Sequence, residues 1–158
     1  MITNLEHTAL SVANMKRSLR FYRDLLGFKV IRTIEPRSDA KLGVIAGLPG
    51  AQARIVHLKF GDAMFELFEY VVPQGRPIPR KRCQADHGLI HLGFKSDDAC
   101  ADYKRLKARG IEFLSAPVEF RPGVWVVYFR GPDGEICELR QDDAEGAEIP
   151  GGSYAIKR

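Results

Sequence analysis

The sequence predicts an α+β fold built from two copies of one unit, each running strand, helix and three further strands. A strand-like stretch with a histidine inside it occurs twice, at residues 5–12 and 89–94, and each is followed by a helix-like segment that ends at a glycine. Each copy then closes on a strand-like stretch with one glutamate among apolar neighbours, Glu66 in the first copy and Glu138 in the second. One unit could not bury a core alone, so we expect the two units to pair their sheets.

Length and composition are those of an ordinary globular protein. The chain has 158 residues, 45% hydrophobic and 28% charged, which fits one domain or two small modules that share a core. Its longest apolar run, residues 124–129, is far too short to span a membrane. The N-terminus has no export signal, and three widely spaced cysteines form no C-x-x-C pair. We therefore expect a cytoplasmic protein without a disulfide framework or a thiolate zinc site.

The net charge of +4 is mildly basic, and part of the excess lies in one segment that contains Arg76, Arg80, Lys81 and Arg82. We expect this segment to be a solvated loop; the alternative is that it attracts an anionic substrate. No aromatic residues interleave with the cluster, and no nucleic-acid-binding motif is present. The predicted partner is a small molecule, with no role for nucleic acid or membrane.

The first module covers residues 4–72. Asn14 is a suitable N-cap for a helix whose apolar positions recur at helical spacing, and Gly27 is a suitable stop. The segment 36–50, rich in glycine and punctuated by proline, predicts a loop that includes one short turn of helix. Gly61 begins a tight turn between two strands. The predicted strands of this module are 4–13, 28–34, 53–60 and 64–72.

A linker, residues 73–86, precedes the second module, residues 87–141. Ser96 or Asp97 is expected to cap its helix, which ends at Gly110. The polar, glycine-rich tail, residues 142–158, is expected to be loose. The predicted strands of the second module are 88–95, 111–114, 123–130 and 135–141.

Strand parity places each repeated histidine beside a small residue. His7 shares its face with Ala9, and His91 shares its face with Gly93, whereas the large apolar neighbours of both face the helices. Small residues beside a polar one predict a cavity on this face of each sheet.

The two repeated glutamates also lie on strand faces opposite their apolar neighbours. A glutamate on an inward face is costly unless something pairs with it, and a divalent cation would pair with two carboxylates and two imidazoles at once. We therefore predict a site for one divalent metal ion held by His7, Glu66, His91 and Glu138. Such a donor set with room for water suits Zn, Ni, Co, Mn or Fe.

The two remaining histidines have no counterpart in the repeat. We expect His57 to be structural and His87 to lie at the mouth of the second module.

The sequence resembles the vicinal oxygen chelate superfamily, which includes glyoxalase I, methylmalonyl-CoA epimerase, extradiol dioxygenases, and fosfomycin and bleomycin resistance proteins. The resemblance covers about residues 4–141 and implies two βαβββ modules forming a cupped, barrel-like mixed sheet around the metal. It rests on His-Thr-Ala-Leu-Ser-Val at 7–12, Ser-Leu-Arg-Phe-Tyr-Arg-Asp-Leu-Leu-Gly-Phe at 18–28, Phe-Glu-Leu at 65–67, His-Leu-Gly-Phe at 91–94 and Pro-Asp-Gly-Glu-Ile-Cys-Glu-Leu at 132–139.

The resemblance also implies roles for single residues. His7, His91 and Glu138 match the ligands that most metal-binding branches share, and Glu66 matches a fourth ligand of the glyoxalase and epimerase branches. It implies a metal-dependent isomerase or lyase, expected here as a homodimer, in which Glu66 or Glu138 moves a proton beside a carbonyl as general base. The long segment 36–50 departs from small glyoxalases and leaves the substrate open.

Other reactions remain as alternatives. The basic linker and the sequence Phe-Glu-Leu-Phe-Glu-Tyr at 65–70 slightly favour an acyl-CoA epimerase over a glyoxalase. A ring-cleaving dioxygenase would hold Fe with His7, His91 and Glu138 alone. A non-enzymatic resistance protein would bind a drug in the cavity without metal.

Overall fold

The computed structural model describes residues 1–37, 40–79 and 81–142, so Arg80 of the basic linker and the predicted loose tail after Asp142 lie outside the described residues. The chain divides into two compact units: unit 1 contains Met1–Arg82 with Pro132–Gly134, and unit 2 contains Cys83–Gly131 and the chain from Glu135. The elements of unit 1 are β1 (His7–Ser11), α1 (Met15–Leu19), the π-helical turn η1 (Arg20–Leu25), β2 (Lys29–Ile34), α2 (Ala40–Ala46), β3 (Gln52–Phe60) and β4 (Ala63–Val72). Those of unit 2 are β5 (Leu92–Lys95), α3 (Ala99–Ala108), β6 (Val118–Arg121), β7 (Val124–Arg130) and β8 (Ile136–Gln141).

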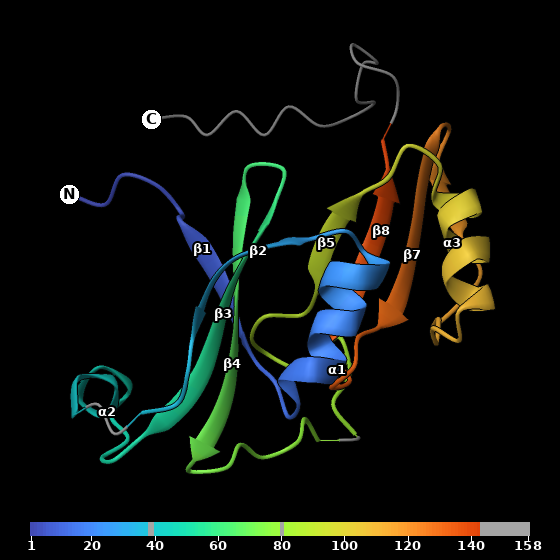
Figure 1. Cartoon of the computed structure of the whole chain (residues 1–158). Coiled ribbons are helices and arrows are strands. Elements are labelled where there is room, and N and C mark those ends of the chain that lie inside the picture. Colours follow the sequence, from blue (N-terminus) through green and yellow to red (C-terminus); the bar gives the residue numbers. More distant parts are fainter. Residues whose placement is uncertain (38–39, 80, 143–158) are drawn as a thin grey trace. The chain divides into compact units, whose positions relative to one another are not determined.

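Both units contain a four-stranded mixed sheet with the same topology. The strand order is β1-β4-β3-β2 in unit 1 and β5-β8-β7-β6 in unit 2 (Figure 1). The first strand of each sheet is parallel to the last strand of the module, and the other pairs are antiparallel. The predicted α+β class with two similar modules is therefore confirmed, and each sheet taken by itself is open.

The first helix begins where the sequence predicts. The side-chain Oδ1 of Asn14 accepts a hydrogen bond from the Arg17 amide at 2.9 Å, which satisfies one of the free N–H groups of the first turn. The second half of the helix is a π-helical turn, in which the Leu26 amide donates to the Phe21 carbonyl at 3.0 Å. Gly27 ends it at φ 90°, a conformation that favours glycine.

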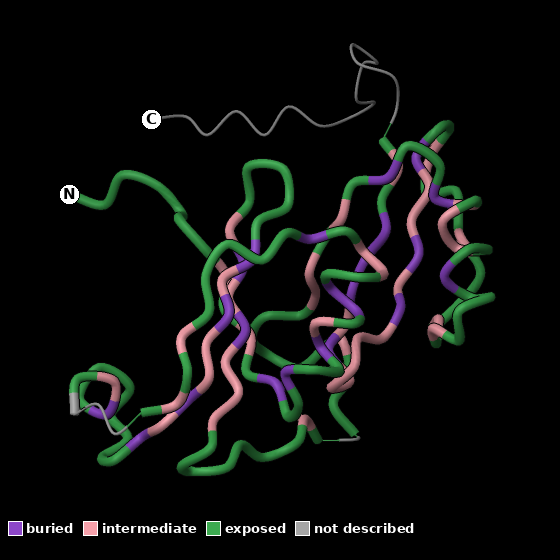
Figure 2. Tube along the Cα trace, viewed as in Figure 1, coloured by how far each residue is buried: buried purple, intermediate pink, exposed green. Residues whose placement is uncertain are grey.

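The core of unit 1 lies between this helix and one face of the sheet. Tyr22 is fully buried, and its ring meets the rings of Phe28 and Phe65 at centroid distances of 5.7 and 5.1 Å. Phe65 and Leu67 of β4 point into this core, so Glu66 between them must point to the other face of the sheet. Figure 2 shows buried and less buried positions alternating along the middle of β3 and β4.

Helix α3 packs against the sheet of unit 2, on β7 and β8, and its N-cap lies one residue beyond the two predicted positions. Asp98 is the N-cap, and its Oδ1 accepts from the Ala101 amide at 2.8 Å. Ser96 instead accepts from the Asp98 amide through its hydroxyl, so it supports the cap rather than forming it. Leu106 of α3 and Phe129 of β7 are fully buried in this core.

One strand prediction in unit 2 was wrong, and another placed the start of its strand too early. Residues 111–114 make only a single bridge, between Phe113 and Phe129, and the strand that pairs with β7 over several residues is β6. The segment between them ends at Pro117, which cannot donate to a ladder and therefore separates the bridge from β6. Strand β5 begins at Leu92, so His91 lies just before the strand rather than inside it.

The helical content of residues 36–50 was underestimated. Helix α2 has seven residues in place of one turn. A Cβ at Gly43 would lie 2.9 Å from the Leu48 carbonyl oxygen, so this glycine serves a close backbone approach rather than a loop. No helix among the described residues is long and apolar enough to cross a membrane.

Candidate functional site

Glu66 lies in a row of residues that crosses the sheet of unit 1 on the face away from the helix core. In the strand register, Ala9 of β1 is opposite Glu66, Glu66 is opposite His57 of β3, and His57 is opposite Arg32 of β2. His7 lies two residues before Ala9, so it projects on the same face. The register therefore agrees with the predicted faces of His7, Ala9 and Glu66.

Two histidines contact the Glu66 carboxylate. The Nε2 atom of His7 lies 3.6 Å from Oε2, and the Nε2 atom of His57 lies 3.3 Å from Oε1. The other ring nitrogen of His7, Nδ1, contacts the Glu6 carboxylate. This bond to Glu6, together with the negative charge of Glu66, raises the pKa of His7 above its ordinary value.

Unit 2 contains a matching pair. The Nε2 atom of His91 lies 2.7 Å from Oε2 of Glu138, whose residue is only 8% exposed. Gly93 lies opposite Glu138 in the register, as Ala9 lies opposite Glu66. A Cβ at Gly93 would lie 3.7 Å from Oε2, so the glycine leaves the space beside the carboxylate open. On the other side of Glu138 lies Tyr128, whose ring centroid is 5.3 Å from that of His91.

The donor set of each pair fits a divalent metal. An imidazole nitrogen faces a carboxylate oxygen in both units, and both are ligand types of Zn, Mn, Fe, Co and Ni. The Nδ1 atom of His91 is buried and has no hydrogen-bond partner in the described structure. No group of three or more His, Cys, Asp or Glu side chains forms a metal cluster among residues 1–37, 40–79 and 81–142.

The contact between His57 and Glu66 was not predicted, because His57 lacks a counterpart in the repeat and was expected to be structural. The tight turn predicted at Gly61 could have indicated this contact, because a hairpin turn fixes which residues of its two strands lie opposite each other. A tight hairpin there pairs Phe60 with Ala63, and counting back along both strands brings His57 opposite Glu66. His87 is exposed, and its predicted place at the mouth of the second module stays a prediction.

Comparisons with known proteins agree with this fold. A family model described as the glyoxalase/bleomycin resistance protein/dioxygenase superfamily matches residues 4–139. A lactoylglutathione lyase of Neisseria meningitidis is 27% identical over 138 residues, covering 87% of this chain and 89% of that protein. The protein YwbC of Bacillus subtilis is 25% identical over 142 residues, covering 89% of this chain and 99% of that protein.

Solved structures share the fold as well. A glyoxalase family protein from Bacillus cereus superposes with a TM-score of 0.79 at 18% identity, covering 89% of this chain and 94% of that chain. The fosfomycin resistance protein FosX from Listeria monocytogenes, in complex with Mn(II) and sulfate, superposes with a TM-score of 0.60 at 17% identity. The superposition covers 92% of this chain and 97% of that chain. The chain belongs to the glyoxalase/bleomycin resistance protein/dioxygenase superfamily.

Proposed function

We propose that the chain is a metal-dependent isomerase or lyase that moves a proton at a carbon next to a carbonyl group, as a glyoxalase or an epimerase does. The observation that carries this proposal is the position of Glu66, which faces His7 from the non-core side of its sheet. Lactoylglutathione lyases at 24–27% identity among the relatives support this class of reaction.

The proposed metal ligands are His7 and Glu66 from unit 1 and His91 and Glu138 from unit 2. The histidine–carboxylate contact inside each unit supports this assignment, because each pair presents the donor types that such an ion prefers. A bound divalent ion would supply Lewis-acid polarisation of the substrate oxygens.

In this proposal a glutamate is the general base that transfers the proton. Glu66 or Glu138 would take the proton from carbon: the C–H bond breaks, an O–H bond forms on the carboxylate, and the electron pair moves onto the carbonyl oxygen. The O–H proton of the carboxylic acid exchanges with solvent, and return of a proton from this group to carbon completes an isomerisation with no other reactant. The small residues Ala9 and Gly93 would leave room for the substrate beside the two carboxylates.

Metal analysis and solvent exchange together test the proposal. Protein purified without chelators is expected to carry about one divalent ion, and His7→Ala and Glu66→Gln to carry much less, whereas His87→Ala serves as the control for loss of an exposed imidazole. Deuterium from solvent should enter a hemithioacetal or an acyl-CoA in the parent protein. Parent protein without metal would contradict the proposal, and oxygen uptake with catechols would support a dioxygenase instead.

A further inference from the structure

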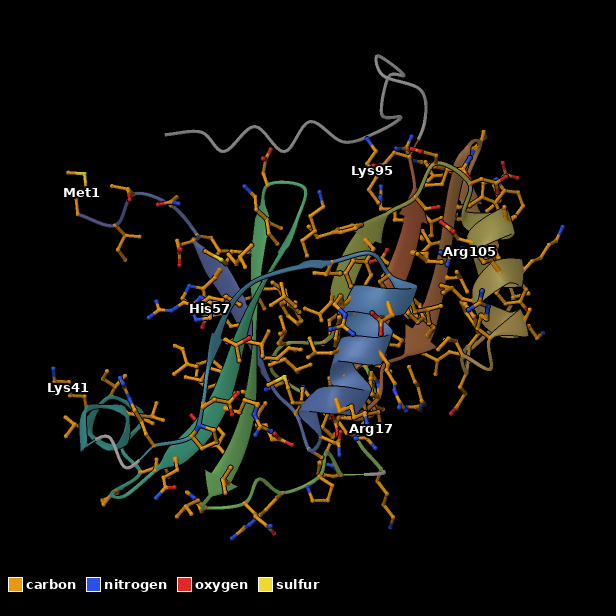
Figure 3. The ribbon with its side chains drawn as sticks, in the orientation of Figure 1. Met1, Arg17, Lys41, His57, Lys95 and Arg105 are labelled. Atoms are coloured by element: carbon orange, nitrogen blue, oxygen red, sulfur yellow. The ribbon has the colours of Figure 1, made fainter. Side chains whose placement is uncertain are left out.

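The contact between His57 and Glu66 has no equivalent in the second module. The glutamate of each module lies opposite one residue of the antiparallel neighbour strand, His57 in unit 1 and Tyr128 in unit 2. His57, labelled in Figure 3, directs Nε2 to Oε1 of Glu66 at 3.3 Å. Tyr128 lies ring to ring with His91 instead. The residue opposite the glutamate therefore differs between the two modules, and so do its contacts.

The two oxygens of Glu66 face different imidazoles. Oε1 faces His57 and Oε2 faces His7, so the carboxylate is contacted on both of its oxygens. A neutral histidine that contacts a carboxylate through Nε2 must carry its proton there to donate. A proton donated to Oε1 from this position would restrict the plane of the carboxylate and keep Oε2 directed toward His7.

The limited solvent exposure of His57 and Glu66 supports a stable contact between their side chains. The side chains of His57 and Glu66 are 19% and 13% exposed, against 41% for His7. His57 also lies between the buried residues Val56 and Leu58, whose packing holds the strand in place. Partly buried polar contacts on rigid strands restrict a ligand more than exposed contacts do.

We propose that His57 is a positioning residue that fixes the Glu66 carboxylate so that Oε2 is presented for metal binding and proton transfer. This inference rests on the proposed function, in which Glu66 is a metal ligand. Hydrogen-bond partners that orient a metal ligand typically change metal affinity 10–100-fold when they are removed. His57 would act through Glu66 and touch neither metal nor substrate.

Binding of Co²⁺ to the metal-free protein is the first test, because the visible spectrum of Co²⁺ reports ligand geometry independently of activity. His57→Leu, which has no donor, is expected to bind Co²⁺ about 10–100-fold more weakly than the parent protein and with an altered spectrum. His57→Gln, whose side-chain amide can donate to Glu66, should stay within about threefold of the parent. His87→Leu, the same change at an exposed site, is the matched control.

Thermal unfolding without metal separates positioning from packing. Equal loss of Co²⁺ affinity in the Leu and Gln variants, together with a lower melting temperature in both, would mean that His57 only supports the fold and would overturn the proposal. Parent-like binding by His57→Leu would overturn it as well.

Imidazole ¹⁵N spectra of the metal-free parent protein test the contact even without metal. Neutral His57 is expected as the Nε2–H tautomer, and its ¹⁵N resonances should shift when Glu66 is replaced by Gln. An Nδ1–H tautomer whose resonances are unaffected by that change would overturn the proposal. A parent protein that binds no Co²⁺ would refute the proposed function, whereas the spectra would still decide whether His57 holds Glu66.

Discussion

Alanine at Gly93 should raise the stability of the metal-free protein, whereas a larger, branched side chain there should lower the metal affinity. Gly93 lies inside β5 and is absent from the glycines with positive φ, so its backbone accepts any residue. Glycine in a strand interior is less stable than alanine by about 0.5–1 kcal/mol. We expect Gly93→Ala to stabilise the metal-free protein by this amount, which is about 1–4 °C in Tm for a chain of this size.

The change in metal affinity depends on the size of the side chain that replaces Gly93. The Cβ of Gly93→Ala would lie 3.7 Å from Oε2 of Glu138, an ordinary contact. In Gly93→Val, a methyl group aimed at Oε2 would come about 1.5 Å nearer than Cβ, well inside the roughly 3.5 Å contact distance. We therefore expect Ala to keep metal affinity within about threefold, and Val to weaken it at least about tenfold, or 1.4 kcal/mol.

Two measurements on the same three proteins check this. Thermal unfolding in the presence of EDTA gives the stability of the metal-free forms, and Co²⁺ titration against a chromophoric chelator gives the affinities. A Val variant that binds Co²⁺ as the parent protein does would refute the role of Glu138 in the site. An Ala variant less stable than the parent protein would refute the account of Gly93 as an open strand position.

Four further outcomes are expected. Glu6→Gln should lower the pKa of His7 toward its ordinary value in NMR titrations. Because Glu6 raises that pKa in the folded state, the variant should have a smaller free energy of unfolding than the parent protein at acidic pH, where His7 is protonated. Above the pKa of His7 the two proteins should differ little in stability. Asp98→Ala should lower the free energy of unfolding in urea by about 1 kcal/mol. Asp98→Asn should lower it much less, because Asn also caps helices. Tyr22→Ala should cost about 3–5 kcal/mol in the same assay, since Tyr22 is fully buried among aromatic rings. The expected homodimer should appear as twice the chain mass in light scattering.

Much of the fold could be predicted because its signals are local. Asn14 and Gly27 delimit the first helix by capping and by backbone conformation, and alternation along β4 sets the face of Glu66. The errors arose where packing decides between similar local patterns. Residues 111–114 are as apolar as a strand, yet only Phe113 is bridged.

The sequence could propose candidate ligands only as far as the repeat extends. Symmetry proposed His7, Glu66, His91 and Glu138 because they occupy matching positions, and the structure adds the histidine–carboxylate contact within each module. His57 has no symmetric partner, so it could be found only from the register of the hairpin, through its pairing with Glu66.

The different residues opposite the two glutamates distinguish the modules chemically. His57 contacts the carboxylate of Glu66, whereas Tyr128 lies opposite Glu138, so the two carboxylates have different surroundings. Two modules with the same strand order can therefore carry carboxylates with unequal tasks, and the same change of glutamate to glutamine is expected to have unequal effects in the two modules.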